Sequence, residues 1–249
     1  MAEEYKGDTV RLALFSDIHA NWAAFEAVWA DLTQYDVHGV YSLGDNVGYG
    51  PSPQEVVAFL HTHGVLSIQG NHERGLVTPQ ERSWFNPHAR QGLEQTRSMM
   101  APEWIQALAA YPLSRVVENA RLVHGCPPDS PFTYLFEYEE DPAQLFEMFD
   151  EPICFVGHTH ELQWVRSQKG RVTHGLLHRG VLTLDTTARY VVNIGSVGQP
   201  RDGDNRAKYV IWDTDQSTLT VRFVPYDIQD TVDKIMARGL PQSSASRLW

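Results

Sequence analysis

Cysteine, clusters of basic residues and long apolar runs are all scarce in this 249-residue sequence. The two cysteines, Cys126 and Cys154, stand far apart without a CxxC spacing, which argues against a disulfide framework and a thiolate zinc site. No apolar run reaches the roughly 18 residues that a membrane-spanning helix needs, and no basic segment with a following apolar run opens the chain. We therefore expect a soluble, cytoplasmic protein with no membrane contact.

Basic residues are also fewer than acidic ones. The sequence has 20 Lys and Arg against 31 Asp and Glu, which gives a formal net charge of −11. An acid excess of this size repels polyanions, so we expect no binding of long nucleic acid. The hydrophobic content of 42% is that of an ordinary globular protein. Because we find no internal repeat and no long linker, we predict a single domain over residues 1–249.

Strand and helix patterns alternate in the first third of the chain. Apolar residues at 10–15 predict a buried strand, and the helical spacing of apolar residues from Trp22 to Leu32 predicts a helix after it. Short strands follow at 40–43 and 65–68, which indicates parallel pairing. Later strands are predicted at 113–118, 121–124, 154–157, 162–166, 190–194, 209–213 and 219–223. The sequence therefore predicts an α/β protein with two sheets.

Polar side chains stand at or just beyond the ends of five predicted strands. They are Asp17, His19, Asp45, Asn71, His72, His124, His158 and His160. Ligand sites in α/β sheets form at the carboxyl ends of strands, so we expect one cleft. Carboxylate, amide and imidazole ligands without thiolate suit Mn, Fe, Zn, Co or Ni. Two such cations about 3.5–4 Å apart can bind both the attacking and the phosphoryl oxygens of a phosphate ester.

The polar residues form five motifs in a fixed order along residues 17–160. They are Asp17-Ile18-His19, Gly44-Asp45-Asn46, Gly70-Asn71-His72-Glu73, His124 and Gly157-His158-Thr159-His160. This set resembles the calcineurin-like metallophosphoesterases, and in particular their small bacterial and archaeal phosphodiesterase-like branch. The resemblance implies a four-layer α/β/β/α sandwich of two mixed sheets. It also implies hydrolysis of a small phosphodiester, nucleotide or dinucleoside polyphosphate by metal-bound hydroxide.

The resemblance further implies a role for each polar residue. Two divalent metal ions are expected, with manganese as the first choice. Asp17, His19 and His160 would hold one of them, Asn71, His124 and His158 would hold the other, and Asp45 would bridge the pair. His72 would act as the general acid, and both Asn71 and His72 would contact the substrate phosphate.

The sequence departs from part of the family at the second motif. Tyr49 stands where the protein phosphatases carry a phosphate-binding arginine, which favours the phosphodiesterase-like branch. Arg201 in a Gly-rich loop is the expected replacement, unless it pairs with Asp202 or Asp204, and Arg74 is a weaker candidate. No aspartate that orients His72 is evident in the sequence, so we expect another partner for its ring, such as a backbone carbonyl.

Residues 126–152 form an insertion rich in proline and aromatic residues. We favour an insertion that packs its aromatic side chains against the sheet or a second subunit, which leaves room for a homo-oligomer. The alternative is a lid whose aromatic faces stack on a nucleobase. Trp84 is interpreted, like Trp104, as a packing residue.

Three other functions remain open at this stage. One is a phosphomonoesterase or protein phosphatase of the same superfamily. Another is a non-catalytic scaffold with this fold, although a scaffold has no need of the full ligand set. The last is a nuclease, which the charge of −11 disfavours.

Overall fold

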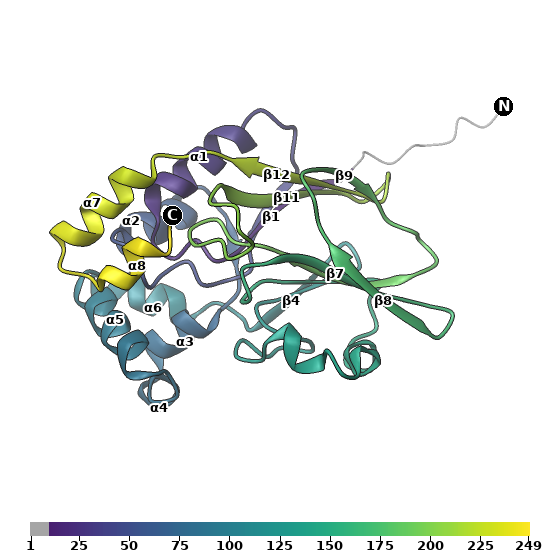
Figure 1. Cartoon of the computed structure of the whole chain (residues 1–249), viewed down its shortest axis with the longest axis horizontal. Coiled ribbons are helices and arrows are strands. Elements are labelled where there is room, and N and C mark those ends of the chain that lie inside the picture. Colours follow the sequence, from purple (N-terminus) through teal and green to yellow (C-terminus); the bar gives the residue numbers. More distant parts are fainter. Residues whose placement is uncertain (1–9) are drawn as a thin grey trace.

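The computed structural model describes residues 10–249, except for the side chain of His88, and consists of two six-stranded sheets with helices around them (Figure 1). The first sheet has the order β3-β2-β1-β11-β12-β9. Its strands are β1 (Arg11–Phe15), β2 (Gly39–Ser42), β3 (Leu66–Ser67), β9 (Gly180–Thr183), β11 (Ala207–Asp213) and β12 (Thr218–Val224). Strands β1, β2 and β3 are parallel, as predicted, whereas β11 pairs antiparallel with β1.

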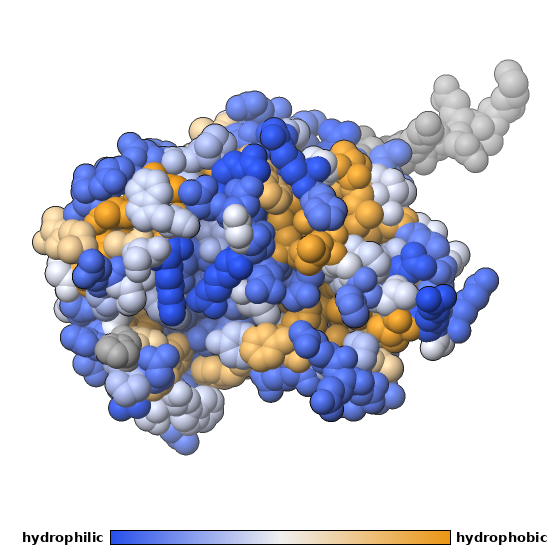
Figure 2. All heavy atoms as spheres, viewed as in Figure 1, coloured by the Kyte–Doolittle hydropathy of each residue, from blue (hydrophilic) through white to orange (hydrophobic). Residues whose placement is uncertain are grey.

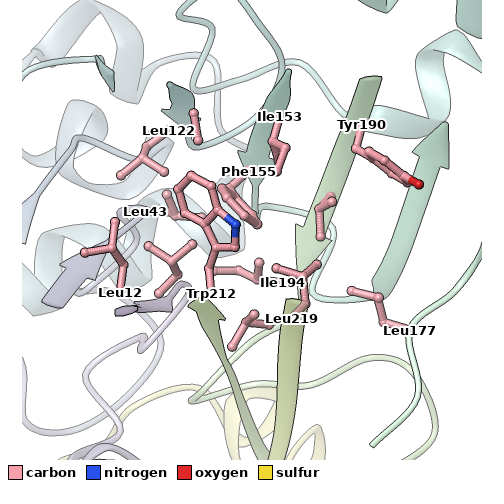
Figure 3. Packing of buried hydrophobic residues seen from close by; sticks show 14 of the residues in the cluster. Leu12, Leu43, Leu122, Ile153, Phe155, Leu177, Tyr190, Ile194, Trp212 and Leu219 are labelled. Atoms are coloured by element: carbon pink, nitrogen blue, oxygen red, sulfur yellow. The ribbon is translucent and has the colours of Figure 1, made fainter. Parts of the chain in front are cut away.

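The second sheet has the order β4-β5-β6-β10-β7-β8 and is also mixed. Its strands are β4 (Ser114–Val117), β5 (Ala120–Val123), β6 (Ile153–Val156), β7 (Leu162–Gln168), β8 (Arg171–Leu176) and β10 (Arg189–Ile194). The main core fills the space between the two sheets, where Trp212 packs against Phe155 with ring centroids 5.3 Å apart (Figure 3). The predicted α/β class with two mixed sheets is confirmed.

The α-helices gather at one end of the sheets, on the left of Figure 1. They are α1 (Trp22–Leu32), α2 (Pro53–Thr62), α3 (Asn71–Val77), α4 (Pro79–Arg82), α5 (Pro87–Ser98), α6 (Pro102–Ala109), α7 (Ile228–Ala237) and α8 (Gln242–Ser246). Helix α1 begins because the Asn21 side chain accepts the backbone N–H of Ala24 at 3.2 Å. Its buried face, which includes Phe25 and Val28, covers the outer side of the first sheet against Phe15.

The insertion of residues 126–152 covers the outer side of the second sheet. It contains two short 3₁₀ helices, η1 (Leu135–Tyr138) and η2 (Pro142–Glu147). Leu145, Phe146 and Phe149 pack there against Cys154 and Val156 of β6. This half of the insertion therefore packs on the sheet as the favoured interpretation expects.

Strands β8 and β9, at the open edges of the two sheets, have no counterpart in the predicted elements. Leu176 and Val181 are 66% and 68% exposed, so these edges lack the buried apolar alternation that identifies a strand in a sequence. Figure 2 shows one face as mostly hydrophilic, with apolar patches over the strands and also at the helical end on the left. Within residues 10–249, no helix has the length and apolar character that crossing a membrane requires.

Candidate metal centre

The strand ends bring all eight predicted polar residues into one buried region. Asp17 and His19 follow β1, Asp45 follows β2, and Asn71 begins α3 just after β3. His124 follows β5, and His158 and His160 follow β6. The eight residues are all buried, and together with Tyr49, Tyr134 and Arg201 most of them line one small cleft.

The backbone is strained at five of the predicted ligands. Asp17, His19, Asp45, His158 and His160 all have φ angles between 48° and 67°, in the left-handed region. Non-glycine residues avoid this region, at a cost of about 1–3 kcal/mol each, and strain of this kind concentrates at functional sites. The sharp turns aim successive side chains into the cleft rather than along the strand.

The first group of donor atoms belongs to Asp17, His19 and His160. The Oδ1 atom of Asp17 lies 3.1 Å from Nε2 of His160 and 3.6 Å from Nε2 of His19. The two Nε2 atoms are themselves 3.1 Å apart. Two imidazole nitrogens and a carboxylate oxygen converging at this spacing can bind one cation.

The second group centres on Asp45. Its Oδ2 atom lies 3.3 Å from Nε2 of His124 and 3.7 Å from Nε2 of His19, and His158 completes a second cluster with His124. Oδ2 of Asp45 therefore lies between the two groups. The other oxygen, Oδ1, accepts the backbone N–H of His72 at 2.8 Å, which fixes the direction of Oδ2.

Unpaired polar atoms in the cleft test whether a metal fits there. Within residues 10–249, Oδ1 of Asp17, Oδ1 of Asn71 and Nε2 of His124 are buried and have no hydrogen-bond partner. Leaving such atoms unpaired costs about 1–3 kcal/mol each, a penalty that coordination of a cation removes. The donor set therefore fits divalent metal ions.

Backbone carbonyls hold three of the histidines in the orientation that a metal ligand needs. A carbonyl oxygen only accepts, so Nδ1 carries the proton and Nε2 is free to coordinate. The pairs are His19 with Val47 at 3.1 Å, His124 with Leu43 at 2.8 Å, and His160 with Gln199 at 2.6 Å.

Burial and mutual charge set the protonation of these groups. Burial alone raises the pKa of Asp17, but the imidazoles of His160 and His124 outweigh it and hold the pKa well below its ordinary range. Burial lowers the pKa of His158 to about 3. Burial also acts to lower the pKa of His124, yet Asp45 and Asp17 raise it to about 9. Metal binding at His124 consequently displaces a proton.

His72 lies at the edge of this cluster, with Nε2 4.0 Å from Oδ2 of Asp45. Its Nδ1 atom is buried without a hydrogen-bond partner among residues 10–249, so the expected backbone carbonyl is wrong. The ring is instead held by packing, with the ring of Tyr49 at 4.6 Å and that of Phe85 at 5.5 Å. A β-carbon on Gly48 would lie only 2.0 Å from Nδ1, so the ring sits directly on the backbone there.

Arg201 lines the same cleft as Asp45 and His72, beside Tyr49. Its two alternative partners are engaged elsewhere, because Asp202 pairs with Lys208 and Asp204 pairs with Arg206. The weaker candidate, Arg74, forms a two-point ion pair with Glu81 and also donates to Gln69. Arg201 is therefore the better placed of the two arginines for a phosphate group.

Glu73 is a buried residue beside the cleft that the sequence alone did not single out. Its buried carboxylate accepts the backbone N–H groups of Asp45, Asn46 and Gly70 at 2.7–2.8 Å. Burial and the charge of Asp45 raise the pKa of Glu73 to about 7. The residue ties the loop that carries Asp45 to the loop that carries Asn71. Its place directly after His72 in the third motif was the available signal.

The front half of the insertion, which carries Phe132 and Tyr134, reaches the cleft. The ring of Tyr134 stacks on His158 with centroids 3.9 Å apart, and the carbonyl of Phe132 accepts Nε2 of His158 at 3.2 Å. Trp84 is 61% exposed and lies edge-on to Phe132 at 5.0 Å, so its interpretation as a buried packing residue is wrong.

The fold and this cluster of carboxylates and histidines are those of a metal-dependent phosphoesterase. The sequence model of the calcineurin-like phosphoesterase superfamily domain matches residues 10–217, and the chain belongs to this superfamily. It is a phosphoric ester hydrolase.

Similar proteins come from both archaea and bacteria. The chain is 34% identical over 245 residues to the uncharacterised protein MJ0912 of Methanocaldococcus jannaschii. The alignment covers 96% of this chain and 97% of that protein. It is 36% identical to a metallophosphoesterase from Sphaerobacter thermophilus of known structure, with a TM-score of 0.83 and coverage of 97% and 98%. The structure of hypothetical protein PH1004 from Pyrococcus horikoshii OT3 shares the fold at 20% identity, with a TM-score of 0.74 and coverage of 96% and 98%.

Proposed function

We propose that this hydrolase uses two divalent metal ions to cleave a small phosphodiester. The observation that carries the proposal is the position of Oδ2 of Asp45 between the Nε2 atoms of His19 and His124, at 3.7 and 3.3 Å. A single oxygen between two groups of imidazole ligands suits a bridging carboxylate. When bound, a pair of divalent cations supplies Lewis-acid activation of a water molecule and of the phosphoryl oxygen.

The residues would divide between the two ions as the family resemblance implies. Asp17, His19 and His160 hold one ion, and Asn71, His124 and His158 hold the other. Manganese is our first choice, because the donor set combines imidazole with carboxylate and amide oxygens. The two cysteines lie elsewhere as buried free thiols, which is compatible with the cytoplasmic location we expect.

His72 serves as the general acid in this proposal. Its Nε2 atom faces the cleft near Oδ2 of Asp45, where it donates a proton to the leaving alcohol as the bond to phosphorus breaks. Asn71 and Arg201 bind the phosphoryl oxygens. The stacked rings of Tyr134 and His158 form one wall of the cleft.

The side chains that line the cleft beside the proposed metal ions favour a diester over a monoester. A diester carries one negative charge at neutral pH, and a monoester carries close to two. Among the residues that line the cleft, Arg201 is the single guanidinium. Its neighbour Tyr49 stays neutral, because burial raises the pKa of the phenol. We therefore expect a phosphodiesterase rather than a protein phosphatase.

The matching aryl esters test this proposal. After reconstitution with Mn²⁺, kcat/KM for bis(p-nitrophenyl) phosphate should exceed that for p-nitrophenyl phosphate. Arg201→Ala should lower the diester rate by about 10-fold or more, the effect of losing a charge-assisted hydrogen bond. Arg238→Ala, which removes an exposed arginine bound to Glu55, is the matched control. A preference for the monoester would make the protein a phosphomonoesterase, and full activity after removal of metal would refute the metal-dependent mechanism.

A further inference from the structure

An aromatic cavity of about 460 Å³ opens beside the metal centre. Its walls come from five segments of the chain: the loop after β2, the start of α3, the α4–α5 loop with the first turn of α5, the insertion, and the loop after β6. The lining residues are Tyr49, Asn71, Trp84, Phe85, Asn86, Ala89, Phe132, Tyr134 and His158. Tyr49, Asn71, Tyr134 and His158 also line the metal cleft, so the two spaces adjoin.

The chemistry of the walls selects a flat, uncharged group. Five of the nine lining residues are Trp, Phe or Tyr, and none is an acid, a lysine or an arginine. The indole of Trp84 makes a T-shaped contact with Phe132 and is 61% exposed, so much of its aromatic surface is open to a ligand. Open aromatic faces bind nucleobases by stacking, with little dependence on which base is present.

Asn86 adds a polar group that suits the edge of a base. Its side-chain oxygen accepts the backbone N–H of Ala89 at 2.9 Å, where it caps helix α5. That hydrogen bond leaves the side-chain NH₂ group to donate to an acceptor on a ligand. The cavity therefore combines stacking surfaces with one amide donor, and its volume is within the range of small-molecule sites.

The position of the cavity indicates which ester group of the substrate it would hold, the one that leaves or the one that stays on phosphorus. Phe85 lines the cavity, and its ring also lies edge-on to His72 at 5.5 Å. The cavity is thus on the side of His72, the proposed proton donor to the leaving alcohol. A group held in the cavity would belong to the alcohol that leaves.

We propose that this cavity binds the nucleobase of a nucleoside that is the leaving alcohol of the substrate. The inference rests on the proposed phosphodiesterase function and narrows its substrate class to nucleoside phosphodiesters. In the reaction, the oxygen of water bonds to phosphorus and that water loses a proton to the solvent. The bond from phosphorus to the nucleoside oxygen breaks, His72 transfers a proton to that oxygen, and His72 regains a proton from the solvent. The other ester group stays on the phosphate.

Two substrates that differ only in the base test the inference. They are adenosine 5′-(methyl phosphate) and the methyl phosphate of 1-O-methylribose, both assayed with Mn²⁺. We expect kcat/KM to be about 10-fold or more higher with the base, the effect of one stacked ring. The products should be adenosine and methyl phosphate, whereas AMP and methanol would overturn the assignment of the leaving group.

Variants of Trp84 test whether the preference for the substrate with the base arises in the cavity. Trp84→Ala should reduce the ratio of the two kcat/KM values to about 2-fold or less, and Trp84→Phe should restore most of it. Trp249→Ala, which removes an indole that is 67% exposed and does not line the cavity, should leave the ratio as in the wild type. An equal loss of both activities in Trp84→Ala would show a merely structural role and overturn the inference.

The outcomes separate this inference from the proposed function. Equal hydrolysis of both diesters by the wild type would overturn the nucleobase site and leave the phosphodiesterase intact. If neither diester is hydrolysed, the hydrolysis of bis(p-nitrophenyl) phosphate decides the proposed function, and adenosine binding still tests the cavity. Adenosine should quench tryptophan fluorescence in the wild type and not in Trp84→Ala, and the absence of quenching in both proteins would contradict the site.

Discussion

The backbone N–H of His72 donates to Oδ1 of Asp45 at 2.8 Å, so one carboxylate positions both the proposed general acid and the centre of the ligand cluster. Because Oδ1 is engaged in this way, Oδ2 points toward His19 and His124. Glu73 holds the backbone of Asp45 from the other side. The geometry of the site therefore depends on backbone contacts between the loops after β2 and β3.

Asp45→Asn should lose metal before it loses fold. The amide retains an acceptor for the His72 N–H but replaces the anionic Oδ2 with an NH₂ group, which cannot bind a cation. We expect metal content to fall by more than half and activity by about 10³-fold or more. Inductively coupled plasma mass spectrometry of the dialysed protein measures the loss. Asp215→Asn, at an exposed turn, is the control, and normal metal content in Asp45→Asn would remove Asp45 from the ligand set.

His72→Ala should keep its metal and lose turnover. We expect kcat to fall by about 10²–10⁴-fold for alkyl leaving groups, which need a proton, and much less for p-nitrophenol. The measurement is kcat for a series of leaving groups. We expect kcat of the variant to depend more steeply on the pKa of the leaving group than kcat of the wild type. The same loss for every leaving group would argue that His72 only shapes the site.

Gly48→Ala should displace the ring of His72, and Gly48 is not itself a proposed metal ligand. Gly48 has φ +88°, and a β-carbon there would meet Nδ1 at 2.0 Å. Gly64→Ala is a matched control, since Gly64 has φ +67° with nothing within 4 Å, and it should cost only about 1 kcal/mol of strain. We expect Gly48→Ala to lower kcat for alkyl esters well beyond Gly64→Ala. Equal kinetics in the two variants would mean that packing on Gly48 does not position His72.

Asp31 provides a stability test away from the site. Its carboxylate binds Arg222 and accepts the hydroxyl of buried Tyr209 at 2.7 Å, and the hydrogen bonds from Arg222 lower the pKa of Asp31. A lowered pKa in the fold means that the carboxylate stabilises the protein above the pKa of the unfolded chain. That stabilisation disappears as the pH falls through the folded value.

Asp31→Asn should therefore lower the free energy of unfolding by about 1–3 kcal/mol at neutral pH. The gap to the wild type should shrink as the pH is lowered, because the wild-type carboxylate is protonated. Urea denaturation across the acid range measures this gap, with exposed Asp215→Asn as the control. A gap that stays constant with pH would show that ionisation of Asp31 contributes nothing.

The metal cleft was predictable because its residues stand at strand ends. Asp17, Asp45 and Asn71 each follow a short apolar run, and parallel strands bring their ends to one edge. The contribution of Phe132 and Tyr134 was not predictable in the same way. They sit in an irregular proline-rich segment, where no periodicity indicates which aromatic rings face the core and which face the cleft.

Trp84 is a second residue whose placement the sequence pattern does not indicate. An indole near a helix is usually buried, and the sequence contains nothing that separates Trp84 from Trp104. Its ring contact in the fold is with Phe132, nearly fifty positions away along the chain, and a local pattern does not indicate such a contact. The partner of His72 was missed for a related reason, because packing on the backbone of Gly48 leaves no trace in a motif.

The number of metal ions per chain tests the central claim most directly. The protein should be stripped with chelator, reconstituted with Mn²⁺, freed of excess metal and measured for metal content and diester hydrolysis together. The account predicts two ions per chain, with activity that disappears on chelation and returns with the second ion. A protein that takes up no metal under these conditions, or that hydrolyses the diester equally well without it, would contradict the account.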